Sequence, residues 1–158
     1  MTDLNQEALN LAYAAGIIDG EGSICITKQK QGKYTSLTVQ ISVANTQPLL
    51  LYWLEQYFGC GCIIKRTTSN PRQRTVFWWC VRSQKAVKEV LQKVYPYLFL
   101  KRRHAKLCLI LQTIREAIPV PVRNGKWWQF QQQPPELAEI KQKIREKVVE
   151  ANRIVEGV

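Results

Sequence analysis

The chain has 158 residues, 46% of them hydrophobic, and a formal net charge of +11. This length predicts one domain over residues 1–158, with a core at about 5–117 and a C-terminal helical extension at about 134–156. No stretch reaches the ~20 consecutive apolar residues of a membrane-spanning helix. The first residues lack the basic and apolar regions of a secretory signal. We therefore expect no membrane partner.

The positive charge is concentrated in the middle of the chain. Residues 22–115 contain sixteen Lys and Arg and two acidic residues, whereas residues 1–21 contain four acidic residues and no basic one. A folded surface with this bias attracts polyanions, of which nucleic acid is the commonest. The alternative is a generic basic protein without such a partner.

The cysteine content argues against a zinc centre. There are five cysteines, at positions 25, 60, 62, 80 and 108, and a single histidine, His104. Cys60 and Cys62 are too close in sequence for a zinc-clamping CxxC pair, and a zinc site needs a fuller ligand set. We expect free thiols and an intracellular, reducing compartment, either a bacterial or archaeal cytoplasm or an organelle.

The predicted elements begin with a helix over residues 5–18, in which apolar residues recur at helical spacing. Two strands follow at 23–30 and 36–44, joined by a polar turn. In the second strand, apolar residues alternate with Ser, Thr and Gln. One face of this strand is therefore expected to be buried, and the other to carry uncharged hydrogen-bonding groups.

The same order of helix and two strands then recurs. A helix begins at Pro48 and ends at Gly59, and strands follow at 60–67 and 75–82. Ser83 is expected to cap a helix that ends at Val94, and further helices are predicted at 100–117 and 136–155. This order predicts an α+β fold, with a curved four-stranded antiparallel sheet backed by helices.

The segment between the first helix and the first strand has an unusual composition. It reads Ala14-Ala15-Gly16-Ile17-Ile18-Asp19-Gly20-Glu21-Gly22. Acidic residues at a helix C-terminus meet the negative end of the helix dipole, and glycines beside Glu21 allow backbone conformations closed to other residues. Carboxylates held in such a place suggest a bound cation. The alternative is an ordinary helix end with acidic residues in solvent.

Residues 14–22 resemble the signature of the LAGLIDADG homing endonucleases, whose family name spells it. Seven of the nine positions match or are conservative, while Ala14 replaces the first Leu and Gly20 replaces the second Ala. The single copy of the motif, the length and the element order agree with the single-motif members, which have an αββαββα core. The resemblance covers about residues 8–115.

The resemblance implies a site-specific endonuclease that cuts both strands of a long, pseudo-palindromic DNA site as a homodimer. The motif helices of the two subunits pack together through small residues. The positions expected at this dimer interface are Ala12, Ala15, Gly16 and Asp19. In each subunit the carboxylate of Glu21, where many members have Asp, binds divalent metal, usually Mg²⁺, with help from the backbone carbonyl of Gly20.

Two further catalytic residues are implied by the resemblance. Gln47 matches a Gln that orders active-site water in a member of the family, and Lys101 matches a lysine near the scissile phosphate. Considered alone, Gln47 is a polar residue at a helix N-terminus, and Lys101 is a solvated lysine in a basic run. The chain also departs from that member, since Leu51 stands where the member has an Arg.

The family lays the polar face of its sheet in the major groove of DNA, where polar and basic side chains contact base edges and phosphates. The expected DNA-binding residues are Thr27, Gln29, Gln31, Tyr34, Thr38, Gln40, Arg66 and Arg74. The alternative for each is an ordinary exposed strand residue. The aromatic residues expected in the core are Trp53, Phe77, Trp79, Trp127 and Trp128.

Two other functions are compatible with the same fold. One is an intron maturase, which binds RNA to assist group I splicing and has lost cleavage. The other is a non-catalytic DNA-binding regulator. The intact carboxylate of Glu21 favours the endonuclease, with double-stranded DNA as partner, over the maturase, whose partner is intron RNA.

Overall fold

The computed structural model describes residues 2–31, 34–67, 72, 74–117 and 135–156. In chain order its elements are α1 (Thr2–Glu21), β1 (Gly22–Gln31), β2 (Tyr34–Asn45), α2 (Pro48–Phe58), β3 (Cys62–Arg66), β4 (Val76–Val81), α3 (Gln84–Val94), the 3-10 helix η1 (Tyr95–Tyr97), α4 (Arg102–Ala117) and α5 (Pro135–Glu156). The predicted order of helix, hairpin, helix, hairpin and helices is confirmed. No helix in this described part is long and apolar enough to cross a membrane.

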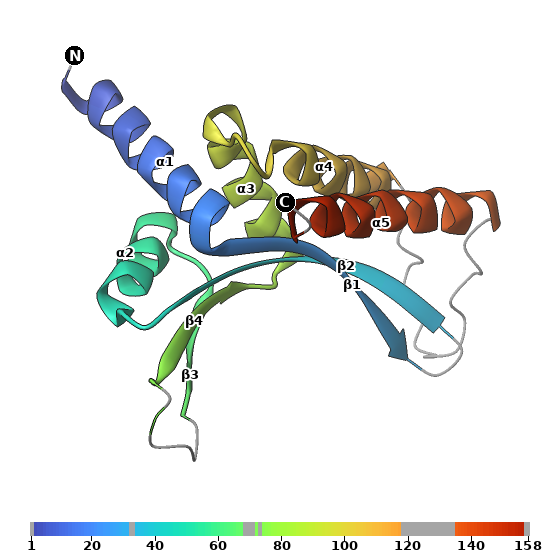
Figure 1. The fold of residues 1–158 in the computed structure, drawn as a ribbon. Helices are drawn as coiled ribbons and strands as arrows, with labels where there is room; N and C mark the ends of the chain where they lie inside the picture. Colours follow the sequence, from blue (N-terminus) through green and yellow to red (C-terminus); the bar gives the residue numbers. More distant parts are fainter. Residues whose placement is uncertain (1, 32–33, 68–71, 73, 118–134, 157–158) are drawn as a thin grey trace, which may run out of the picture.

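The four strands form one antiparallel sheet in the order β1-β2-β4-β3. The ends of the two hairpins diverge, so the sheet is curved (Figure 1). Helices α1, α3, α4 and α5 lie on one side of it, above the sheet in Figure 1, and among the described elements none covers the concave side. The predicted α+β class with a curved, helix-backed sheet is thereby confirmed.

The core lies between the sheet and the helices, because every second strand residue is apolar and points to that side. The buried strand residues there are Ile24, Ile26, Val39, Ile41, Val43, Trp79 and Val81. Burying each such aliphatic side chain contributes about 1.5–3 kcal/mol. Of the aromatic residues predicted in the core, Trp79 is fully buried, and Trp53 and Phe77 pack against the core while partly buried. Trp127 and Trp128 lie outside the described residues.

A glutamine side chain continues the sheet where β4 ends. The pairing of β2 with β4 stops at Ile41 and Val81, so Val39 lies beyond it. The amide of Gln84 accepts a hydrogen bond from the backbone N–H of Val39 and donates one to its carbonyl, both at 3.0 Å. Gln112 and Arg115 of α4 also donate to the oxygen of Gln84, at 3.0 and 2.9 Å. These bonds fix α3 and α4 over the middle of the sheet.

Three local predictions need correction. Ser83 precedes α3, but its hydroxyl makes no capping hydrogen bond. The first helix continues to Glu21 instead of ending at residue 18. Among the described glycines, Gly59 and Gly61 have positive φ, and those beside Glu21 do not. Gly22 is needed for another reason, since a Cβ there would lie 2.6 Å from the carbonyl oxygen of Ile18.

Candidate functional site

Asp19, the first acidic residue of the motif, points toward the interior of its own subunit. Asp19 is only 9% exposed. Its carboxylate accepts hydrogen bonds from the backbone N–H groups of Phe99 at 2.7 Å, Leu100 at 3.2 Å and Lys101 at 2.9 Å. These groups immediately precede α4, which has no acidic residue in its first turn. Asp19 therefore supplies the negative charge that a helix N-terminus favours.

Lys101 completes the connection between α4 and the motif. Its side-chain amine donates a hydrogen bond to the backbone carbonyl of Asp19, although the two residues are 82 positions apart. The last turn of α1 contains no basic residue of its own. Lys101 thus places a positive charge at the negative end of the α1 dipole. Partial burial lowers the pKa of Lys101, and the Asp19 carboxylate acts in the opposite direction.

Glu21 is the motif carboxylate that faces solvent. It is the last residue of α1, it is exposed, and it lies two residues beyond the carbonyl that Lys101 contacts. The preceding Gly20 is also exposed, and a Cβ built on it would meet nothing within 4 Å. Because Asp19 is committed to three N–H groups, Glu21 is the acidic group here that can bind an external ligand.

The donor set at this junction fits a hard cation shared with the substrate. Carboxylate and carbonyl oxygens are the ligands that Mg²⁺ prefers, and it commonly takes one or two carboxylates together with phosphate and water oxygens. Among the described residues there is no group of three His, Cys, Asp or Glu side chains that could hold a metal by itself. A single exposed carboxylate at this junction is therefore compatible with a metal that needs oxygens from a phosphate or from a second copy.

Gln47 lies between β2 and α2 and is exposed. Its backbone N–H donates to the side-chain oxygen of Asn45 at 2.8 Å, and its own side chain makes no capping bond to α2. Gly22 pairs with Val43, so the end of β2 lies beside the junction of α1 and β1. Gln47 is thus a polar residue at the N-terminus of α2, as its alternative interpretation states, although its side chain does not cap the helix. Its catalytic role stays a prediction.

Six of the expected DNA-binding residues lie in the β1–β2 hairpin. The pairs Thr27–Thr38, Gln29–Ser36 and Gln31–Tyr34 are cross-strand neighbours, and Gln40 lies opposite Cys25. The hydroxyl oxygens of Thr27 and Thr38 are 2.7 Å apart. Thr27, Thr38 and Gln40 alternate with the buried residues of the two strands, which places them on the open face of the sheet. The side chains of Gln29, Gln31 and Tyr34 lie outside the described ones, so their DNA contacts stay predictions.

The second hairpin adds Trp78, which was not among the residues expected from the sequence, beside the expected Arg66. Arg66 is exposed at the end of β3, and its guanidinium carbon lies 5.3 Å from the ring centre of Trp78. Trp78 is only partly buried and alternates with the buried Trp79. Arg74 is exposed but precedes β4, outside the paired strand. The run from Val76 to Val81 is apolar at every position, so no alternation revealed which of its residues faces outward.

Two of the four residues expected at the dimer interface are buried within their own chain. Ala15 is fully buried in the core of its own chain, and Asp19 is held against the start of α4. Neither side chain can therefore line a surface that a second copy reaches. Ala12 and Gly16 are exposed, as that surface requires. The exposed large apolar residues that accompany them on α1 are Leu9 and Tyr13.

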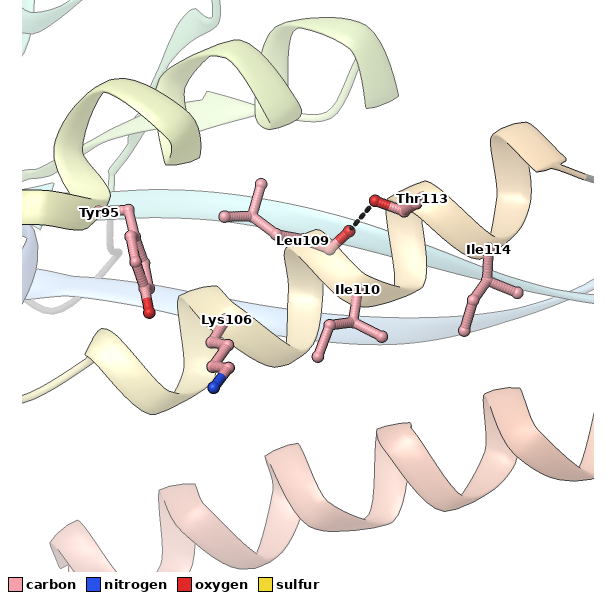
Figure 2. Close-up of a pocket in the computed structure, with 6 residues that line it drawn as sticks. All are labelled: Tyr95, Lys106, Leu109, Ile110, Thr113 and Ile114. Carbon is pink, nitrogen blue, oxygen red and sulfur yellow. Dashed lines mark hydrogen bonds between the residues drawn. The ribbon is translucent and has the colours of Figure 1, made fainter.

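The helical side carries a groove of about 360 Å³ along α4 (Figure 2). Its lining residues are Tyr95, Lys106, Leu109, Ile110, Thr113 and Ile114. The hydroxyl of Thr113 already donates to the carbonyl of Leu109 at 3.1 Å. This lining includes no carboxylate, histidine or cysteine, so the groove does not compete with the Glu21 junction as a catalytic site.

Comparison with known proteins agrees with this arrangement. The LAGLIDADG endonuclease family profile matches residues 14–114. The chain is 29% identical over 117 residues to the DNA endonuclease I-CvuI of Chlorella vulgaris, an alignment that covers 70% of this chain and 66% of that protein. The chain thus spans just under two thirds of this relative's length.

Solved structures show the same fold. The homing endonuclease I-CvuI in complex with its target, in the presence of 2 mM Ca, has a TM-score of 0.72 at 24% identity and covers 92% of this chain and 83% of that one. The archaeal intron-encoded homing endonuclease I-Vdi141I complexed with DNA has a TM-score of 0.69 at 15% identity, covering 92% and 85%. With the motif, the fold and the family profile in agreement, the chain belongs to the LAGLIDADG endonuclease family.

Proposed function

We propose that this protein is a site-specific endonuclease that cuts both strands of double-stranded DNA as a homodimer and depends on divalent metal, with Mg²⁺ as the metal. The observation that carries the proposal is that the amine of Lys101 contacts the Asp19 carbonyl at the end of α1, two residues before the exposed carboxylate of Glu21. Glu21 directly precedes β1, a strand of the sheet whose concave side is left open by the described elements, in a chain of net charge +11.

The chemistry divides among a few groups of the chain. Glu21, with the Gly20 carbonyl, holds the metal, which when bound supplies an activated water and neutralises phosphate charge. The amine of Lys101, bound to the carbonyl two residues before Glu21, stabilises the negative charge that builds on the phosphate. Gln47, exposed at the end of β2, orients water by hydrogen bonding.

The dimer is proposed to form through the exposed face of α1. Ala12, Gly16 and Gly20 are four residues apart and exposed, so a second helix backbone can approach them closely. Phe99, which is 86% exposed, donates its backbone N–H to Asp19 and adds a large apolar side chain near the end of the motif. Two copies related by a two-fold axis bring two Glu21 residues together and imply a pseudo-palindromic site.

Two observations support double-stranded DNA as the partner: the chemistry of the open sheet face and the similarity to endonucleases solved with DNA. The open face of the β1–β2 hairpin carries hydroxyl and amide groups, which donate to and accept from base edges in the major groove. The similar endonucleases I-CvuI and I-Vdi141I were solved bound to DNA. All five cysteines are free thiols, which supports work in a reducing, intracellular compartment.

The test is a cleavage-site selection from a random or genomic DNA library with Mg²⁺, with Ca²⁺ and with chelator. We expect a defined pseudo-palindromic site that is cut in Mg²⁺ and left intact with chelator. Tight binding of intron RNA without cleavage of any DNA would favour the maturase. Sequence-specific DNA binding without cleavage in any metal would favour the regulator.

A further inference from the structure

The open face of the sheet has two halves of different chemistry. The β1–β2 half presents hydroxyls and an amide, from Ser23, Thr27, Thr38 and Gln40. In the β3–β4 half, the register places Cys62 opposite Cys80, Ile64 opposite Trp78 and Arg66 opposite Val76 on the same face. The paired residues of this second half other than Arg66 are apolar or weakly polar, and Arg82, directly after β4, hydrogen-bonds to the thiol of Cys80. A hydrogen-bonding surface therefore adjoins a largely apolar one, on which Arg66 lies beside Trp78.

Trp78 is the largest side chain of the apolar half and is only partly buried. It lies between Ile64 of β3 and Ala44 of β2, its direct neighbours across the sheet. Among the described elements none packs over this face, since the helices cover the opposite side (Figure 1). A large aromatic group left in water on a folded surface commonly marks a binding site.

Arg66 is held against this ring. Its guanidinium carbon lies 5.3 Å from the ring centre of Trp78, within the range of a cation–π contact. Such a contact uses the flat face of the guanidinium and leaves its N–H edge free to donate. The ring thereby limits the freedom of a long, exposed side chain and keeps its donors over the open face.

We propose that Trp78 and Arg66 act together as a base-reading unit, in which the ring of Trp78 contacts the C5-methyl group of a thymine and Arg66 donates to an adjacent guanine. This inference rests on the proposed function and names the bases that the β3–β4 half reads. It assigns Trp78 as a specificity-determining residue.

The chemistry of the major groove supports this assignment. The thymine methyl is the one apolar group that a standard base pair presents there, and Arg most often contacts the O6 and N7 acceptors of guanine. An apolar ring beside a fixed guanidinium matches that pair of features. The hydroxyl and amide side chains of the β1–β2 half match hydrogen-bonding edges instead, so the two halves read DNA by different chemistry.

The first experiment compares the sites selected from a random duplex library in Ca²⁺ by the wild type and by three variants. The wild type is expected to select a thymine beside a G·C pair in each half-site. Trp78→Gln should lose the preference for thymine, and Arg66→Gln should lose the preference for the G·C pair. Lys85→Gln changes an exposed residue of α3, on the opposite side of the sheet, and should retain both. Identical selected sites for the wild type and Trp78→Gln would overturn the proposal.

The second experiment removes the methyl group from the DNA instead of the ring from the protein. Replacing the selected thymine by uracil deletes one methyl, which should weaken wild-type binding by about fourfold. The same replacement should not weaken DNA binding by Trp78→Gln. It should weaken binding by Trp78→Phe, which keeps an apolar ring, but by less than it weakens wild-type binding. An equal loss for wild type and Trp78→Gln would contradict the contact.

The two proposals fail in different ways. If the wild type selects no DNA site, the endonuclease function itself is wrong, and this inference falls with it. If a defined site is cut in Mg²⁺ but the thymine preference does not depend on Trp78, only the base-reading unit is wrong. Because uracil replacement alters the DNA alone, the wild-type measurement does not depend on how any variant folds.

Discussion

Lys101 contacts Asp19 twice: its backbone N–H donates to the Asp19 carboxylate at 2.9 Å, and its side-chain amine donates to the Asp19 backbone carbonyl. One residue thereby joins the start of α4 to the end of α1. The two acidic residues of the motif therefore have different roles. Asp19 holds the start of α4 in place, and Glu21, two positions later, is exposed.

Asp19→Asn should destabilise the fold. The Asn side chain keeps one acceptor oxygen but replaces the other with an amide NH₂, which cannot accept from the N–H groups that precede α4. Leaving a buried donor unsatisfied costs about 1–3 kcal/mol. Urea unfolding followed by circular dichroism measures this loss. An unchanged free energy of unfolding would show that the three bonds do not hold α4.

Lys101→Arg should change the alkaline limb of the pH–rate profile. Burial lowers the pKa of Lys101, so its ammonium loses the proton at a lower pH than a free lysine does, while Arg stays charged. Wild-type cleavage should therefore begin to fall at a pH below the ordinary lysine pKa of about 10.4. Lys101→Arg should show a smaller fall over the same alkaline range.

The control for this prediction is a lysine far from the motif. Lys85→Arg changes an exposed residue of α3 and should leave the wild-type pH profile intact. Superimposable alkaline limbs for wild type and Lys101→Arg would mean that the charge of Lys101 is not needed during cleavage.

Two glycines of α1 and its junction should respond oppositely to a larger side chain. Gly22→Ala forces a Cβ to within 2.6 Å of the Ile18 carbonyl oxygen, so it should destabilise the single chain by about 1–3 kcal/mol. Gly16→Leu meets nothing within 4 Å of its Cβ in the single chain and should leave the fold intact. It should instead prevent close helix packing and dimerisation.

Light scattering and thermal unfolding separate these two effects. The wild type should have about twice the 18.3 kDa mass of one chain, and Gly16→Leu should have the mass of one chain. Gly22→Ala should unfold at a lower temperature than the wild type. A dimer of undiminished stability in Gly16→Leu would rule out α1 as the contact between subunits.

The five cysteines should react at different rates in the native protein. Burial raises the pKa of Cys25, Cys60 and Cys80, and that of Cys108 to about 12, so these thiols form little of the reactive thiolate at neutral pH. Cys62 is exposed. A disulfide reagent should therefore titrate one fast thiol, and Cys62→Ser should remove it. Five equally fast thiols would contradict the burial of the other four.

Much of the fold was predictable because its signals are local. The alternation in β2 fixed which face is buried, and Gly59, with a φ of 62°, ends α2 as its sequence position indicates. The nonapeptide was equally readable. Periodicity could not predict contacts between residues that are distant in sequence, such as the bond between Gln84 and Val39, 45 positions apart.

The residues of the candidate site could be proposed from the sequence, but their contacts could not. Lys101 was assigned through a resemblance, and the structure places it against the motif. Small size alone did not distinguish Ala15, which fills the core, from Gly16, which is exposed one position later. Trp78 was missed because β4 is apolar throughout, and only its pairing with β2 and β3 shows which side it faces.

The most direct test of the account is Glu21→Gln, measured for binding and for cleavage. Replacing the exposed carboxylate with an amide of the same shape should leave binding of the selected site in Ca²⁺ within about twofold of wild type, because the proposed base contacts lie on the sheet. Cleavage in Mg²⁺ should fall by at least about a thousandfold, since removing a metal-binding group removes the charge that stabilises the reacting phosphate. Undiminished cutting by Glu21→Gln would contradict the account.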